Sequence, residues 1–99
     1  MRKKVWLRSG GGCEACGRST TEESGHLDHF WGRAKAEESE ETCWFLCLDC
    51  DAAKTVNSPS NTYWLEAFRT HCLSHGYLSQ FDRIEARIKW NNVKHKERT

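Results

Sequence analysis

Two pairs of cysteines with the spacing C-x-x-C constrain the folding of this chain more than any other feature. The first pair is Cys13 and Cys16, the second is Cys47 and Cys50, and residues 17–46 separate them. Two residues between cysteines let one tight turn direct both sulfurs at a single ion, and two such turns complete the tetrahedral shell that zinc prefers. With all four positions filled by protein, the pattern predicts a structural zinc. The alternatives are a redox C-x-x-C or ordinary buried cysteines.

The size and composition of the chain also favour a metal-stabilised fold. With 99 residues, of which 37% are hydrophobic, the chain is long enough for one domain with a small core. Domains of this size often need a metal or disulfides in addition to their core. Cys43 and Cys72 lie outside the C-x-x-C pattern and are expected in the core.

The predicted environment is the cytoplasm, either of a bacterium or of the host cell of a phage. No stretch is apolar enough to span a membrane, and residues 1–7 lack the apolar segment of a signal peptide. In a reducing cytoplasm, cysteines bind metal more readily than they form disulfides.

Positive charge is concentrated at both ends of the chain, although the formal net charge is only +1. Acidic residues gather within residues 37–41, which leaves the two termini basic. Lys3, Lys4 and Arg8 are therefore candidates for contact with the phosphates of DNA. The alternative is that they are ordinary solvated residues of a surface.

Two short strands and two helices are expected. Residues 26–31 and 43–46 suit strands, and residues 33–42 suit a loop. Ser58 and Pro59 predict a helix start, and Gly76 predicts its end. A second helix should begin near Ser79 with Asp82 completing a capping box. The apolar stripes of these helices are Trp64, Leu65, Phe68 and Cys72, then Phe81, Ile84 and Ile88.

Acidic and imidazole side chains lie between and after the cysteine pairs. Asp28 and His29 are neighbours in the first predicted strand, and Asp51 directly follows Cys50. Neighbours on a strand point to opposite faces, so a bend is needed if Asp28 and His29 are to reach one substrate. His26 is either a contact to substrate or an ordinary strand residue, and the strand residue is favoured. His71 and His75, four residues apart on a helix, are interpreted as surface or core residues.

The order of these elements resembles the HNH (ββα-metal) endonuclease family. The resemblance covers residues 13–55: a C-x-x-C pair, then Asp28-His29, then Leu46-Cys47-Leu48-Asp49-Cys50-Asp51-Ala52-Ala53-Lys54-Thr55. It implies an α+β fold, a zinc-stapled ββα-metal core of two antiparallel strands and a helix around one divalent cation. The expected organisation is a single domain over 1–99, with a basic N-terminal arm (1–12), the zinc ribbon and core (13–57) and two further helices (58–99).

The resemblance also implies roles for individual residues. Asp28 and Asp51 would bind a catalytic Mg²⁺ or Mn²⁺, and His29 would be the general base that activates water. Arg33 and Lys54 could add positive charge beside the scissile phosphate, or be ordinary surface charges. The sequence departs from the family at Asp51, where His or Asn is usual, and at Thr42, where the family has a middle Asn that mainly braces the loop.

The function expected from these features is metal-dependent cleavage of DNA, by nicking and with weak sequence specificity. Histidine has a near-neutral pKa suited to a general base, and two carboxylates suit a hard cation that polarises the phosphate. A protein partner could supply targeting, since no recognition module is present in so short a chain. The alternative is a non-catalytic zinc-ribbon protein that binds nucleic acid or serves phage assembly, with a decayed site. Neither DNA over RNA nor the oligomeric state is decided by the sequence.

Overall fold

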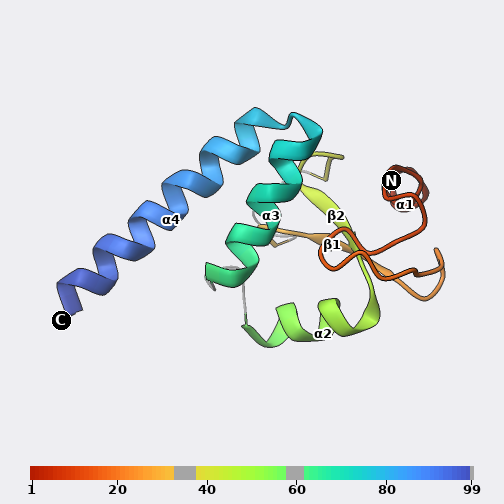
Figure 1. Ribbon diagram of the computed structural model, residues 1–99, viewed down its shortest axis with the longest axis horizontal. Helices are drawn as coiled ribbons and strands as arrows, with labels where there is room; N and C mark the ends of the chain where they lie inside the picture. The colour runs from red at the N-terminus through yellow and green to blue at the C-terminus, as the bar shows by residue number, and fades with distance from the viewer. Residues whose placement is uncertain (33–37, 58–61, 99) are drawn as a thin grey trace. The chain divides into compact units, whose positions relative to one another are not determined.

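The computed structural model describes residues 1–32, 38–57 and 62–98 (Figure 1). Over these residues the chain is an α+β protein with four helices and one two-stranded antiparallel sheet. Its contacts divide it into two compact units, Met1–Ser58 and Pro59–Thr99. The division lies one residue from the predicted boundary between the core and the helical extension. No helix in the described part of the chain combines the length and apolar character needed to cross a membrane.

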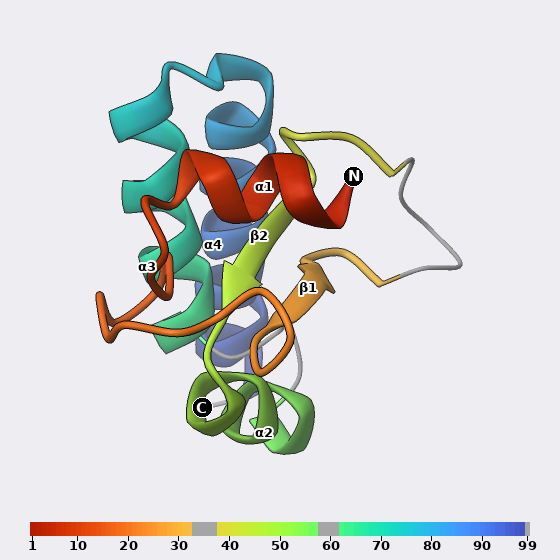
Figure 2. The same cartoon turned by 90° about the vertical axis from the view of Figure 1, so that its right-hand side faces the viewer.

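The sheet of the first unit consists of β1 (His26–His29) and β2 (Cys43–Leu46), which pair side by side (Figure 2). In the antiparallel register His26 lies opposite Leu46 and His29 lies opposite Cys43. The strand expected over residues 43–46 is confirmed, whereas β1 ends two residues earlier than predicted. Gly32 follows with φ of +91°, a backbone conformation that suits glycine and turns the chain out of the strand.

Two helices pack against this hairpin. The helix α1 (Arg2–Arg8) was not predicted as a helix from the sequence. Seven residues are too few for a stable isolated helix, so tertiary contacts must hold it. Val5 is fully buried in a cluster with Cys43 and Phe45, to which Trp6 and Leu27 add partly buried surface. The helix α2 (Leu48–Asn57) follows β2 directly and packs against both strands.

Gly25 permits the close packing at the start of β1. A Cβ atom at this position would lie 2.2 Å from the Cε1 atom of Phe45. Phe45 is fully buried, so the ring has no room to move away. The residue before β1 therefore has to be glycine for this part of the core to close.

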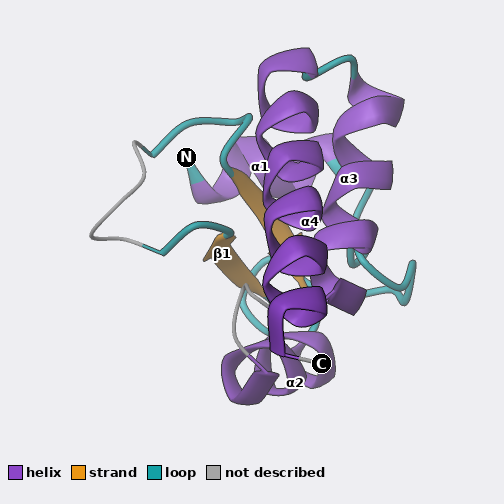
Figure 3. Ribbon diagram, turned by 90° about the vertical axis from the view of Figure 1, so that its left-hand side faces the viewer, coloured by secondary structure: helices purple, strands orange, loops and turns teal. Residues whose placement is uncertain are grey.

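The second unit is a helical hairpin of α3 (Thr62–His75) and α4 (Leu78–Arg98), shown in purple in Figure 3. The predicted stop is confirmed, since α3 ends at His75 and Gly76 follows with φ of +73°. The predicted start at Ser58 and Pro59 lies outside the described residues. The capping box of Ser79 and Asp82 is wrong, because α4 already begins at Leu78.

Apolar side chains of α3 and α4 follow the predicted stripes. Buried in α3 are Trp64, Leu65, Phe68 and Cys72. In α4, Ile84 is fully buried, and Phe81 and Ile88 are partly buried. The helical pattern of the sequence thus identified the inward faces of both helices.

Candidate metal centre

The four cysteines of the C-x-x-C pairs meet in one cluster. The Sγ atoms of Cys13, Cys16, Cys47 and Cys50 all lie within 4.8 Å of one another, and those of Cys16 and Cys47 are 3.8 Å apart. A tetrahedral site with Zn–S bonds of about 2.3 Å has edges of about 3.8 Å. The cluster therefore has the donor type, number and spacing of a site for a metal such as zinc.

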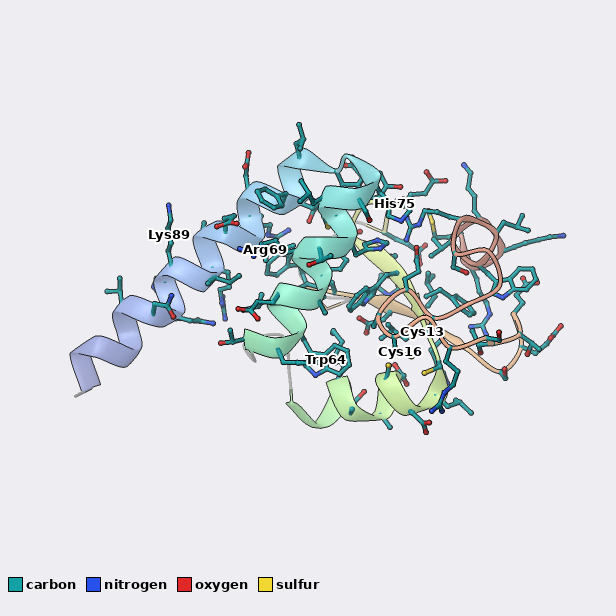
Figure 4. All side chains as sticks on the ribbon, viewed as in Figure 1. Cys13, Cys16, Trp64, Arg69, His75 and Lys89 are labelled. Atoms are coloured by element: carbon teal, nitrogen blue, oxygen red, sulfur yellow. The ribbon has the colours of Figure 1, made fainter. Side chains whose placement is uncertain are left out.

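Local backbone geometry directs the sulfurs inward. The first pair lies on the loop before β1, and the second spans the start of α2 (Figure 4). The backbone N–H groups of Ala15 and Cys16 point at Cys13 Sγ (3.4 and 3.5 Å), and that of Cys50 points at Cys47 Sγ (3.5 Å). Gly17, at φ of +81°, completes the first turn. These N–H groups stabilise negative charge on sulfur, which is the form that binds metal.

Two thiols of the cluster differ in acidity. Burial disfavours ionisation of Cys13, but the backbone N–H groups of Cys47, Cys16 and Ala15 outweigh it and lower its pKa to about 7. Burial and the neighbouring sulfurs together raise the pKa of the Cys50 thiol. The Cys13 thiolate therefore forms readily, whereas ionisation of the Cys50 thiol calls for a compensating cation.

A buried ion pair ties the first cysteine turn to the sheet. Arg8 Nε and Nη2 donate to the two carboxylate oxygens of Glu14 at 2.9 and 2.6 Å. Glu14 in turn accepts a hydrogen bond from the backbone N–H of Phe45 at 2.9 Å. The Arg8 side chain is only 13% exposed. The expectation that Arg8 contacts phosphate is therefore corrected: its guanidinium is used inside the fold.

One face of the hairpin carries two of the polar residues named in the sequence analysis. His26 and Asp28 are two residues apart on β1 and share a face, because side chains alternate along a strand. Trp44 lies opposite Asp28 in the register, and its indole Nε1 donates to Asp28 Oδ2 at 2.8 Å. The indole fixes the orientation of this carboxylate.

The same carboxylate oxygen also meets Lys54, which reaches it from α2. Lys54 Nζ is 3.0 Å from Asp28 Oδ2, 3.5 Å from the carbonyl oxygen of Phe30 and 4.9 Å from the centre of the Phe30 ring. Lys54 is 6% exposed. The ammonium group of Lys54 is thus buried against Asp28, and its place beside a phosphate stays a prediction.

Asp51 lies in the first turn of α2, three residues before Lys54 and on the same side of that helix. His26 Nδ1 is 3.8 Å from Asp51 Oδ2. Two pairs of side chains thus face each other between β1 and α2. His26 faces Asp51, and Asp28 faces Lys54. In the described part of the chain, His26, Asp28 and Asp51 do not form a close ligand group like that of the cysteines. The even spacing of His26 and Asp28 is the signal in the sequence that places both on one face of β1.

His29 lies away from this cluster. Its alternation with Asp28 and its pairing with Cys43 place it on the face that carries Leu27 and Phe45. The strand is regular up to His29, so the bend that would bring both side chains together is absent within β1. His29 Nε2 is 2.9 Å from Glu38 Oε1, and its side chain is 7% exposed. No pattern in the sequence distinguishes Glu38 from its acidic neighbours as the partner of His29.

Thr42 braces the residues that lead into β2. Its hydroxyl accepts a hydrogen bond from the Ser39 backbone N–H at 3.1 Å, and the Ser39 hydroxyl accepts one from the Thr42 N–H at 3.2 Å. The Thr42 carbonyl accepts a bond from Phe30 N–H at 3.0 Å. Thr42 thereby joins Ser39 to Phe30, the residue that follows β1.

The other predicted nucleic-acid contacts differ in their surroundings. Lys3 and Lys4 are exposed on α1, and Lys4 forms an ion pair with Glu40 at 3.4 Å. Arg33 lies outside the described residues.

In the second unit, the rings of His71 and His75 are 4.6 Å apart on α3, and His71 also stacks on Phe68. His75 and Arg69, labelled in Figure 4, mark this helix.

Comparison of the chain with protein-family models, with curated proteins and with solved structures gives no match. The function is therefore inferred from the site itself.

Proposed function

We propose that this protein is a metal-dependent endonuclease that resembles the HNH family, with a structural zinc and a second, hard divalent cation. The observation that carries the proposal is the meeting of β1 and α2 beside the cysteine cluster. There the strand contributes His26 and Asp28, and the first turn of the helix contributes Asp51. Zinc in the cysteine cluster would fix the junction of β2 and α2, and so the position of Asp51 relative to Asp28.

The side chains offered by this junction suit phosphodiester hydrolysis. Asp28 and Asp51 supply carboxylate oxygens, the ligands that Mg²⁺ and Mn²⁺ prefer. A cation held there would polarise the phosphate and stabilise the leaving oxygen. His29, whose Nε2 lies 2.9 Å from Glu38 Oε1, remains the proposed general base, and its action on a phosphate held at Asp28 would require β1 to bend at this residue. DNA is the proposed substrate, with targeting supplied by a partner.

The test is cleavage of supercoiled plasmid by zinc-loaded protein, with Mg²⁺ or Mn²⁺ and with EDTA as the metal-free control. Asp51→Ala should abolish nicking with either metal while the protein keeps its zinc. Asp49→Ala is the matched control, because Asp49 lies on the same helix but is exposed and pairs with Arg18. Loss of nicking in both variants, or in neither, would contradict the assignment of Asp51.

A non-catalytic zinc-stapled module that binds nucleic acid is the second candidate. The contact between Lys54 and Asp28 favours it, because a buried ammonium group already neutralises the carboxylate expected to hold the metal. This candidate predicts that the protein retards DNA in a gel shift without cutting it under any metal condition. Nicking that requires Mg²⁺ or Mn²⁺ and disappears in Asp28→Asn would exclude it.

A further inference from the structure

One face of α4 carries three exposed side chains in a row, which we call the α4 row. Its members are Arg83, Arg87 and Trp90. They follow one another at intervals of four and three residues, so they lie on the same side of the helix. This side is separate from the stripe around the fully buried Ile84, which packs in the helical hairpin. The α4 row is therefore open to a partner.

Trp90 places a large flat ring on this surface. The residue is 52% exposed, and the guanidinium carbon of Arg87 lies 5.1 Å from the ring centre. The electron-rich face of an indole attracts a cation, so ring and positive charge are held side by side. Proteins that bind single-stranded nucleic acid use this combination, because bases stack on the ring while cations neutralise the phosphates.

The sequence of α4 also carries an excess of positive charge. It contains six lysine and arginine residues and three acidic ones, Asp82, Glu85 and Glu97. Glu85 accepts a hydrogen bond from Arg69 of α3 at 2.9 Å, so its charge is balanced inside the helical hairpin. The formal net charge of the whole chain is only +1, so the excess is a property of this helix. Its charge complements that of a polyanion.

We propose that the α4 row binds single-stranded nucleic acid, with one unpaired base stacked on Trp90 and neighbouring phosphates paired with Arg83 and Arg87. In a duplex, each base face is covered by the next base pair, so Trp90 meets a free base face only where a strand is unpaired. A contact to phosphates alone would not use the indole. This inference goes beyond the proposed function, because it assigns binding to the second unit and involves neither the cysteine cluster nor a divalent cation.

The direct test is the affinity of the full-length, zinc-loaded protein for a fluorescein-labelled thymidine oligonucleotide of about 12 nucleotides. Fluorescence anisotropy reports binding, in buffer without Mg²⁺ or Mn²⁺. Stacking of one base contributes a factor of about 5 to 150 in affinity, so Trp90→Leu should weaken binding by that factor. Trp90→Phe keeps an aromatic face and should recover most of the loss. Tyr63→Leu is the matched control, because Tyr63 is 67% exposed on α3, outside the α4 row.

The two arginines should act through the phosphates. Exchange of Arg83 and Arg87 for Gln should lower the slope of log affinity against log salt by about 0.7 for each phosphate that is no longer neutralised. Lys89→Gln should leave the slope unchanged. Lys89, labelled in Figure 4, is exposed on α4 but lies two residues from Arg87 and so on another side of the helix.

Further arms of the experiment identify the ligand. A uridine oligonucleotide of the same length distinguishes RNA from DNA, and Trp90-dependent binding of either supports the proposal. A duplex should bind with an affinity that Trp90→Leu does not change. Trp90-dependent binding in the absence of plasmid nicking supports this inference, and only the nuclease activity then fails.

Two results would overturn the proposal. The first is equal affinity of the wild type and Trp90→Leu for the single-stranded oligonucleotides, even if the plasmid is nicked. The second is Trp90-dependent binding to vesicles of phosphatidylcholine and phosphatidylserine without affinity for either oligonucleotide, which would assign this basic face to a membrane surface.

Discussion

Removal of one cysteine ligand should unfold the first unit. Cys47→Ala deletes a sulfur that is 3.8 Å from Cys16 Sγ and accepts the N–H of Cys50, and Cys47 is 4% exposed. Structural zinc in small domains contributes on the order of 10 kcal/mol. At roughly 0.1 kcal/mol per residue, a unit as short as Met1–Ser58 has a total stability of only about 6 kcal/mol. The metal contribution exceeds this margin, so the loss of one ligand should remove cooperative unfolding altogether.

The assay combines zinc stoichiometry with near-ultraviolet circular dichroism during heating, which reports on the buried Trp44. The wild type should carry about one zinc per chain and melt cooperatively, and Cys47→Ala should do neither. Cys43→Ala is the matched control. Cys43 is equally buried but lies in the core, and burial raises the pKa of its thiol, so it should stay neutral. A Cys47→Ala protein that binds zinc and melts like its parent would refute the assignment.

Three further predictions concern the basic and imidazole residues. His29→Ala should lower nicking by about 10²–10⁴-fold, the usual contribution of a general base; full activity in this variant would exclude His29 from catalysis. Exchange of Lys3 and Lys4 for Gln should flatten the slope of log affinity against log salt by about 0.9 for each phosphate that α1 no longer neutralises, and an unchanged slope would mean that α1 does not touch DNA. Arg8→Met should destabilise the protein by about 3–5 kcal/mol in chemical denaturation, because it removes the cation that balances the charge of the buried Glu14 carboxylate. Loss of DNA affinity with unchanged stability would instead indicate that Arg8 contacts DNA.

Short-range patterns in the sequence predicted several parts of the structure. The two C-x-x-C turns place their sulfurs by local backbone geometry, and so the cysteine cluster could be predicted from spacing alone. The strand over residues 43–46 and the end of α3 at Gly76 follow from equally local rules. Alternation along β1 also indicated that Asp28 and His29 point to opposite faces unless the strand bends.

Tertiary structure decided which of these residues meet. The helix α1 exists because Val5 and its neighbours cover the hairpin. Such tertiary contacts cannot be predicted from the helix propensities of its seven residues. Arg8 and Lys54 look like surface charges in the sequence, yet both are buried in ion pairs with residues that are distant along the chain or on another element. Which residue pairs with a charged side chain depends on how the helices and strands pack. That packing depends on many contacts between segments that are distant along the chain. The sequence alone therefore determined the cysteine cluster and the candidate chemistry, while only the packing of β1 against α2 revealed that Lys54 sits on Asp28.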